Sequence, residues 1–195
     1  MMARRRTASQ QVSAVLLDAA EAVLDRDGVG GVTIRAVAQH ASVSPMSVYN
    51  RFGSKDGMLV ALAMRALDQL AAAIDVSADI EPKERFILAC RNYRDFAIRH
   101  PARYSLIFGA GTPLEDQASD VARSGRAVFD VLVALIRTLK VSDRKRDLPE
   151  DAQIVWSAVH GAVTIEQAGI GQTPDAADTF DRMLKMFATG FAHGR

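Results

Sequence analysis

The amino-acid sequence predicts an all-α protein, and three observations lead to this prediction. Apolar residues recur at intervals of three and four along nearly the whole chain, and no stretch keeps the two-residue alternation of a β-strand. Serine, threonine, glycine and proline stand where helices would start or end. Apolar residues make up 49% of the chain and charged residues 24%, a balance typical of a folded globular protein.

The first helix is expected over residues 9–26. Thr7 and Gln10 have the spacing of a capping box at its start. Gly28 stands where an apolar stripe ends, and glycine commonly follows the last turn of a helix. We therefore expect the chain to leave this helix at Gly28.

Two short helices are expected next. Thr33 can cap the first of them, and the segment 42–44 breaks its pattern. Ser44 is a natural N-cap and Pro45 suits a first helical position, so the second short helix is expected over residues 45–52. The side chains expected to fill the turn and anchor this helix to a core are Val43, Val48 and Phe52.

Six further helices complete the predicted fold, one of them short. Ser54 can cap a fourth helix, which fades into the linker VSADIEP near residue 76. The remaining five helices are expected at about 82–100, 104–108, 121–139, 149–169 and 174–193. The pattern suggests a first domain over 1–53, a connecting helix over 54–76 and a second domain over 77–195.

The distribution of charge is more informative than its sum. The whole chain carries a formal charge of only +1, which favours no particular partner. Up to Lys55, however, there are seven basic and four acidic side chains. No acidic residue occurs between Gly28 and Lys55, whereas Arg35, Arg51 and Lys55 all do. Such a segment is the electrostatic footprint of a polyanion-binding surface.

The two short helices match a helix-turn-helix, whose second helix lies in the major groove of DNA. Arginine and asparagine read guanine and adenine edges with paired hydrogen bonds, and apolar atoms of proline or methionine can contact a thymine methyl group. Lys55 would suit a phosphate. The residues expected to face outward are Pro45, Met46, Ser47, Asn50 and Arg51, with Tyr49 at the edge. A basic helix that is merely solvated has the same pattern, so the pattern alone leaves both interpretations open.

The stretch GVGGVTIRAVAQHASVSPMSVYNRFGSKDGML resembles the N-terminal DNA-binding domain of the TetR family of transcriptional repressors. The resemblance covers the glycine exit, the turn, the recognition helix and Ser54-Lys55. Ser42 departs from the family, which usually has glycine there, at a position that favours left-handed backbone. By position, the resemblance implies base contacts from Ser44, Pro45, Met46, Ser47 and Arg51, and phosphate contacts from Thr33, Tyr49 and Lys55, with Arg35 and Asn50 on the same surface.

The segments RNYRDFAIRHPARYSLIF and VWSAVHGAV resemble the ligand-sensing domain of a TetR subgroup with a Trp, His, Gly signature. This resemblance implies a small-molecule effector, and the few charged residues on these faces favour an apolar, aromatic or amphipathic one. The residues expected to contact it are Tyr93, Phe96, Tyr104, Phe108, Phe129, Trp156 and His160. A packed aromatic core would have the same spacing, and His160 alone is better explained as a core residue.

The resemblance also implies a homodimer, in which the last two helices pair with their twofold mates as a four-helix bundle. These helices are apolar around more of their circumference than the surface of a monomer would tolerate. The residues expected at the dimer interface are Val159, Val163, Phe180, Leu184, Phe187 and Phe191.

Other classes of site find little support. The four histidines lack the spacing of metal ligands, the glycine-rich stretches lack the context of a nucleotide loop, and no catalytic motif is present. We expect neither a metal nor a cofactor. Cys90 is the only cysteine, and neither a secretory signal nor a transmembrane span is expected, which favours the cytoplasm and no membrane partner.

The sequence therefore predicts a repressor that binds palindromic operator DNA as a homodimer and is released by an effector. Two alternatives remain open. An all-helical small-molecule carrier or enzyme would explain the second domain but not the acid-free segment. An activator would have the same sequence signature as a repressor.

Overall fold

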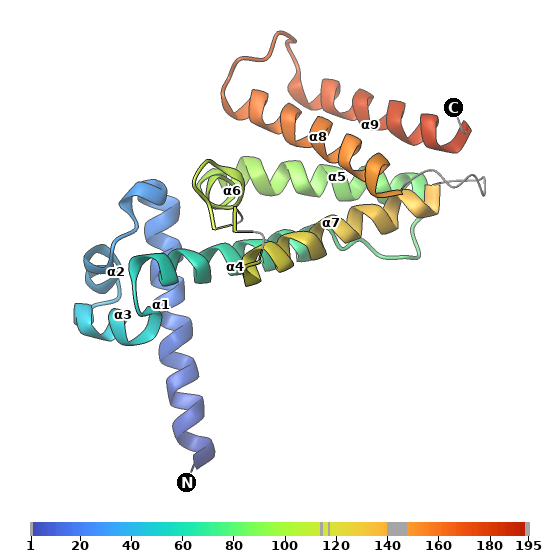
Figure 1. The fold of residues 1–195 in the computed structure, drawn as a ribbon. Helices are drawn as coiled ribbons and strands as arrows, with labels where there is room; N and C mark the ends of the chain where they lie inside the picture. The colour runs from blue at the N-terminus through green and yellow to red at the C-terminus, as the bar shows by residue number, and fades with distance from the viewer. Residues whose placement is uncertain (1, 114, 117, 140–147, 194–195) are drawn as a thin grey trace. The chain divides into compact units, whose positions relative to one another are not determined.

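A computed structural model describes residues 2–113, 115–116, 118–139 and 148–193, and within these ranges it contains nine α-helices and no β-strand (Figure 1). The helices are α1 (Met2–Gly31), α2 (Ile34–His40), α3 (Pro45–Phe52), α4 (Lys55–Ile74), α5 (Pro82–Arg99), α6 (Pro101–Phe108), α7 (Asp120–Leu139), α8 (Leu148–Gln167) and α9 (Ala176–His193). The all-α prediction is confirmed, and most predicted helix positions agree with these bounds to within a few residues.

Helix α1 differs from the prediction at both ends. It begins at Met2, so Thr7 and Gln10 lie inside the helix and the predicted capping box is wrong. The residues before Thr7 are methionine, alanine and arginine, which are strong helix formers. Gly28 has a φ of 71° and a ψ of −178°, yet a helical turn resumes and continues to Gly31. The predicted end of the helix is therefore a kink.

The chain folds into two compact units. The first combines the residues up to Leu67 with His100–Arg123, and the second combines Asp68–Arg99 with the residues from Ser124 onward. Helix α4 thus contributes its first part to one unit and its last part to the other. Helix α6 belongs to the first unit although it follows α5 in the sequence. The functional division into 1–53, 54–76 and 77–195 stays a prediction.

The first unit is built around α1, which packs against both α2 and α6, while α2 packs against α3 (Figure 1). Its most deeply buried side chains come from five helices and include Leu16, Leu24, Val37, Val48, Met58, Leu62 and Ile107. Val48 anchors α3 as predicted, because it is the one buried residue of that helix. The rest of α3 is free to present its other faces.

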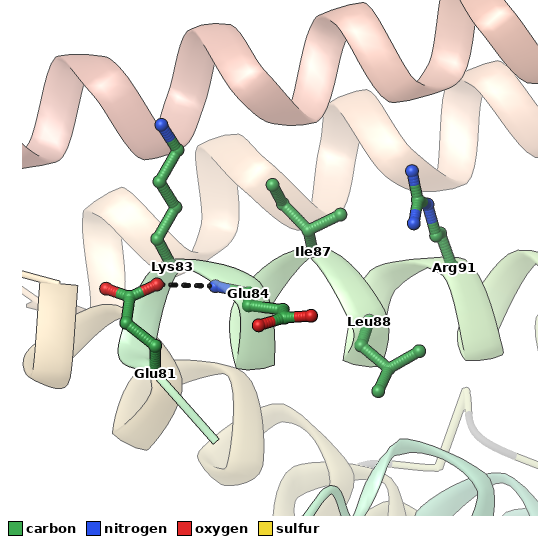
Figure 2. Close-up of a pocket in the computed structure, with 6 residues that line it drawn as sticks. All are labelled: Glu81, Lys83, Glu84, Ile87, Leu88 and Arg91. Carbon is green, nitrogen blue, oxygen red and sulfur yellow. Dashed lines mark hydrogen bonds between the residues drawn. The ribbon is translucent and has the colours of Figure 1, made fainter.

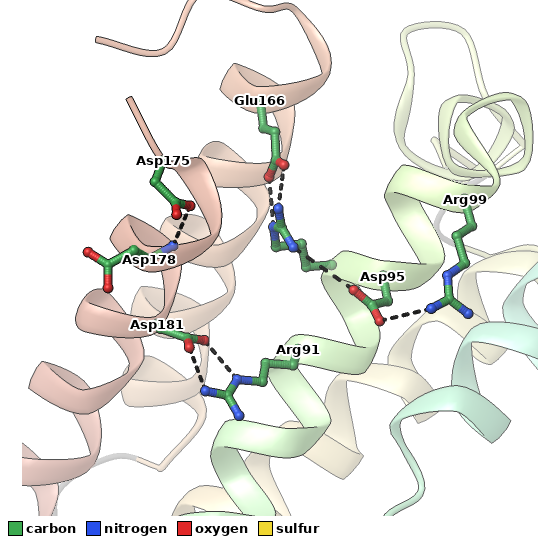
Figure 3. A network of polar contacts seen from close by, with 8 residues as sticks. Arg91, Asp95, Arg99, Glu166, Asp175, Asp178 and Asp181 are labelled. Carbon is green, nitrogen blue, oxygen red and sulfur yellow. Dashed lines mark hydrogen bonds and ion pairs between the residues drawn. The ribbon is translucent and has the colours of Figure 1, made fainter. Parts of the chain in front are cut away.

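In the second unit, α5, α8 and α9 pack against one another, and ion pairs reinforce the contacts (Figure 3). Arg91 of α5 donates to both carboxylate oxygens of Asp181 in α9, at 2.7 and 2.5 Å. This hydrogen bonding lowers the pKa of the Asp181 carboxyl. Arg94 forms a similar pair with Glu166 of α8, where Nε lies 2.7 Å from Oε2. Helix α5 is therefore tied to both C-terminal helices.

Helix α4 is long and apolar enough to cross a membrane by composition, with a mean hydropathy of 1.5 over its most apolar window. The sequence did not lead us to expect a transmembrane span, and α4 meets the criterion by length and composition only. A single helix of this kind is weak support for a membrane span, because core helices have the same composition. In this fold Met58, Leu62, Leu67 and Leu70 of α4 are buried.

Candidate nucleic-acid interface and sensing residues

The turn between α2 and α3 begins with well-defined helix caps. The Thr33 hydroxyl oxygen accepts a hydrogen bond from the Ala36 amide at 3.1 Å, which confirms Thr33 as the N-cap of α2. This bond satisfies one of the amides that a helix start leaves without a partner. Thr33 and the neighbouring Arg35 are both exposed on the first turn of α2.

Helix α2 ends in a Schellman motif. The Val43 amide donates to the Ala38 carbonyl at 2.9 Å, and the Ser42 amide donates to the Gln39 carbonyl at 3.2 Å. Ser42 occupies the left-handed position of this motif, with a φ of 55°. The backbone predicted at this position is confirmed. Val43, however, is 37% exposed, so it does not fill the turn as predicted.

Helix α3 starts at Ser44, whose hydroxyl oxygen accepts from the Ser47 amide at 3.2 Å. The two serine hydroxyls also lie 3.0 Å apart and form a hydrogen bond. Pro45 takes the first helical position, and Gly53 closes the helix by donating to the Tyr49 carbonyl at 2.8 Å. Because these bonds are local, the sequence was sufficient to predict this helix over 45–52.

The outer surface of α3 is polar and cationic, with Pro45 and Met46 as its apolar side chains. Ser44, Pro45, Met46, Tyr49, Asn50 and Arg51 are exposed, and Ser47 is half-buried. Met46 is 64% exposed and Tyr49 is 50% exposed, so both can reach a partner. The Arg51 guanidinium lies 5.2 Å from the centre of the Phe52 ring, which is within the range of a cation–π contact. Phe52, at the end of α3, is half-buried.

Helix α4 begins beside the end of α3. The Ser54 hydroxyl oxygen accepts from the Gly57 amide at 2.9 Å, as predicted for its cap. Any Cβ at position 57 would lie 2.1 Å from the Phe52 carbonyl oxygen, so this close approach requires glycine. Lys55 is exposed on the first turn of α4, where the helix dipole already favours an anion.

The four acidic side chains of α1 are paired with arginines. Ion pairs join Asp18 to Arg65, Glu21 to Arg65 and Arg103, Asp25 to Arg103, and Asp27 to Arg26. Among the described residues, by contrast, no ion pair involves Arg35, Arg51 or Lys55. These three exposed cations therefore keep their full charge for an external polyanion.

Four of the predicted effector residues meet in the second unit. The Trp156 indole Nε1 donates to the Tyr93 hydroxyl at 3.3 Å. The Phe129 ring lies edge-on to Trp156, with 6.2 Å between ring centres, and the His160 ring lies 6.0 Å away. Burial lowers the pKa of His160, which favours its neutral imidazole form. Trp156, Phe129 and His160 are only half-buried.

The other three predicted effector residues are placed differently. Phe96 is buried on α5, three residues after Tyr93. Tyr104 and Phe108 lie on α6 in the first unit, where their rings make an edge contact with 5.0 Å between centres. Their contribution to an effector site stays a prediction.

A shallow hollow of about 260 Å³ lies along the start of α5 (Figure 2). It is lined by Glu81, Lys83, Glu84, Ile87, Leu88 and Arg91. None of the predicted effector residues is among them. Its mixed charges are typical of a solvated helix face, so the sequence carried no signal for it.

The predicted dimer residues divide into two groups. Val159, Val163, Phe180 and Leu184 are at most 3% exposed, so they belong to the core of the chain itself. Phe187 and Phe191 are half-buried and stack with 6.3 Å between ring centres. The large exposed apolar side chains of α8 and α9 are Ile154, Ile165 and Met186, and the sequence pattern did not distinguish them.

A helix-turn-helix with an outward cationic surface, joined to a second all-helical unit, defines a helix-turn-helix transcriptional regulator. Comparison with known families agrees. Residues 16–62 match the domain described as "Bacterial regulatory proteins, tetR family", and residues 86–187 match "Tetracyclin repressor-like, C-terminal domain". The chain belongs to the TetR family.

Individual relatives span nearly the whole chain. The HTH-type transcriptional regulator Mb1846 from Mycobacterium bovis is 25% identical, over 97% of this chain and 96% of its own. BioQ from Mycobacterium smegmatis has a TM-score of 0.66 and 25% identity, over 92% of this chain and 97% of its own. BioQ has also been solved with its natural double-stranded DNA operator, and that structure has a TM-score of 0.65 and 24% identity, over 93% and 98% of the two chains.

These relatives decide one of the alternatives. They are transcriptional regulators and not enzymes, so the chain is a transcriptional regulator and the enzyme alternative is wrong. The resemblance to the subgroup with the Trp, His, Gly signature stays a prediction.

Proposed function

We propose that this chain is a repressor that binds palindromic operator DNA as a homodimer and is released by a small apolar or aromatic effector. The observation that carries the proposal is the unneutralised surface of the helix-turn-helix. Arg35, Arg51 and Lys55 are exposed and carry no ion pair among the described residues, while the acids of α1 are paired with arginines. BioQ, a relative of similar fold, is known with its operator.

The exposed residues of α3 have the chemistry for base recognition. Arg51 and Asn50 can each form paired hydrogen bonds with a base edge, and Met46 can contact a thymine methyl group. Thr33 lies at the start of α2 and Lys55 at the start of α4, and both can contact DNA phosphates. Ser44 and Ser47 are engaged with each other through their hydroxyls, so their base contacts would use the remaining donor and acceptor capacity.

A homodimer supplies the geometry that one recognition helix lacks. Two such helices must enter successive major grooves about 34–36 Å apart, so the operator should be palindromic. An effector that prefers an arrangement with a different separation shifts the population away from the DNA-binding state. Repression follows if the operator overlaps a promoter, and the cytoplasm is then the site of action.

For the dimer contact we propose the exposed apolar surface of α8 and α9. Ile154, Ala158, Gly161 and Ile165 recur at intervals of four, three and four, which places them along one face of α8. Ile154 is 58% exposed and Ile165 is 47% exposed, while a Cβ at Gly161 would meet nothing within 4 Å. The small residues allow a partner helix to approach closely. Met186 of α9, 76% exposed, would extend this surface.

For the effector we propose the aromatic cluster around Trp156. The rings of Phe129, Trp156 and His160 are half-buried, and Tyr93 is buried beneath them at 6% exposure. The hydrogen bond between Trp156 and Tyr93 places polar atoms among apolar rings, as in a small-molecule pocket. The lowered pKa of His160 favours its uncharged form, which suits an uncharged effector. The hollow beside Ile87 is the competing position, and Ile87→Ala is the matched control. An inducer whose affinity depends on Ile87 and not on Tyr93 would place the effector in that hollow.

The test of DNA binding combines selection with salt titration. Genomic fragments bound by the wild-type protein should contain a palindrome. Operator affinity should then fall steeply with salt, and Lys55→Ala should flatten the log–log slope by about 0.9 for each lost phosphate contact, or about 1.8 for a dimer. Lys83→Ala, an exposed lysine of the second unit, is the control and should leave the slope unchanged. Recovery of no palindromic site, together with an unchanged slope for Lys55→Ala, would refute the proposal.

A further inference from the structure

Helix α6 is joined to α1 by a single arginine that reaches two carboxylates. Arg103 donates from Nε to Asp25 Oδ1 at 2.9 Å and from Nη2 to Asp25 Oδ2 at 2.5 Å. Its Nη1 forms an ion pair with Glu21 Oε1. The Arg103 side chain is only 15% exposed, so these contacts are shielded from solvent more than a surface ion pair is.

Glu21 connects a third helix to the same cluster. Arg65 of α4 lies with its Nε 2.6 Å from Glu21 Oε2 and its Nη1 2.6 Å from Asp18 Oδ1. Glu21 is 9% exposed, and removing a partner of a buried carboxylate strongly destabilises the folded state. One carboxylate of α1 is thus held between arginines of α4 and α6.

The three helices that meet at Glu21 have different roles in the proposed function. Helix α1 packs against α2, which in turn packs against the recognition helix α3. Helix α4 begins with Lys55, a proposed phosphate contact. Helix α6 carries Tyr104 and Phe108, which the sequence analysis predicts to contact the effector. Arg103 is the immediate neighbour of Tyr104, so a shift of the α6 backbone at Tyr104 would also move the start of the Arg103 side chain.

We propose that Arg103 is a positioning residue for operator binding, and that its ion pairs with Glu21 and Asp25 hold α6 and α1 in the arrangement that binds DNA. This inference rests on the proposed function. A bidentate pair is either made or broken, so it separates two discrete arrangements rather than a continuous range. An effector that draws α6 away from α1 would break these contacts and lower operator affinity.

The test measures operator affinity of Arg103→Met by fluorescence anisotropy, on an operator selected with the wild-type protein. Measurements are made well below the unfolding transition, where circular dichroism shows the variant to be folded. A loss of stability alone does not change affinity there, because the unfolded fraction is negligible. We expect binding to weaken by about fivefold or more, in the range usual for coupling between sites.

Arg91→Met is the matched control, because it breaks a bidentate pair of the same kind with Asp181 in the second unit. We expect its operator affinity to stay within about twofold of the wild type. Asp25→Asn should weaken binding less than Arg103→Met, because Glu21 keeps both of its arginines, and it provides a milder variant if Arg103→Met does not fold. In a double-mutant cycle, Glu21→Gln and Arg103→Met should lose less together than the sum of their separate losses.

Two results would overturn the inference while leaving the proposed function intact. One is wild-type affinity in both folded Arg103→Met and Asp25→Asn proteins. The other is an equal loss of affinity in Arg91→Met, which would show that any broken ion pair has the same effect. A wild-type protein that binds no operator would overturn the proposed function and this inference together.

Discussion

Ser42 is predicted to reduce the stability of the fold, and Ser42→Gly should raise it. Its φ of 55° lies in the left-handed region, which costs a residue with a side chain about 1–2 kcal/mol. Among the described residues, its side chain makes no hydrogen bond, so removing it should cost no contact in the folded state. The Schellman bonds at this turn come from the amides of Ser42 and Val43 and survive the change.

The expected gain is smaller than the strain that is relieved. Glycine has more freedom in the unfolded chain, which offsets about 0.5–1 kcal/mol of the gain. A net stabilisation of about 0.5–1 kcal/mol remains. For a chain of this length, that corresponds to a rise in Tm of about 1–4 °C.

Two existing glycines provide matched controls. Gly53 has a φ of 73° and open space around its Cβ position, so Gly53→Ala should lower Tm through the backbone alone. Gly30 also has open space but lies in helical backbone, so Gly30→Ala should raise Tm. The two substitutions are chemically identical and should have opposite signs.

The assay is thermal unfolding by circular dichroism at one fixed protomer concentration, since dimer formation would make Tm depend on concentration. Operator affinity should not change in Ser42→Gly, because the position of α3 is set by contacts that this substitution retains. A lower Tm for Ser42→Gly would refute the reasoning. So would shifts of the same sign for Gly53→Ala and Gly30→Ala.

Three further outcomes are expected. Met186→Glu should convert dimers to monomers in light scattering and abolish operator binding. Ile98→Glu, also at an exposed apolar position, should do neither. A wild-type protein that is monomeric at micromolar concentration would contradict the proposed dimer. The fluorescence emission of Trp156, the only tryptophan, should change when an inducer binds. Tyr93→Phe should lower the affinity for that inducer without altering DNA binding in its absence. An unchanged inducer affinity would assign these rings to the core. Burial raises the pKa of Cys90 from 9.0 to about 12, so the unfolded thiol ionises first and stability should fall as the pH rises through this range. A thiol reagent should accordingly react at pH 8 only after denaturant is added, and reaction in the native protein would contradict the burial of Cys90.

Local structure was predictable because its causes are local. The caps at Thr33, Ser44 and Ser54 each depend on a hydroxyl oxygen and an amide three residues further on. The left-handed turn at Ser42 follows from the same short-range geometry. The helix-turn-helix could therefore be placed from the sequence to the residue. The start of α1 could not, since no strong stop signal precedes its apolar stripe and helix formers extend it.

The orientation of long helices was harder to predict. Helix α8 carries apolar residues on two faces, one with Val155, Val159 and Val163 and one with Ile154 and Ile165. Periodicity shows that both stripes exist but not which of them packs against α5 and α9. The stripe expected to face a partner is in fact the core of the chain. Branched apolar side chains are equally suited to both positions, so only the tertiary contacts distinguish them.

The charge of the DNA-facing surface shows the same limitation in electrostatic form. Counted along the sequence, the acids of α1 oppose the bases of the first quarter of the chain. In the folded first unit they are bound instead by Arg26, Arg65 and Arg103, two of which lie beyond residue 55. An acid already paired a few ångströms from an arginine contributes little field beyond about 10 Å at 0.1 M salt. The cations of α2, α3 and α4 therefore act with less opposition than the sequence count implies. A steep salt dependence of operator binding is the expected consequence, because each cation that meets a phosphate releases counterions from the DNA.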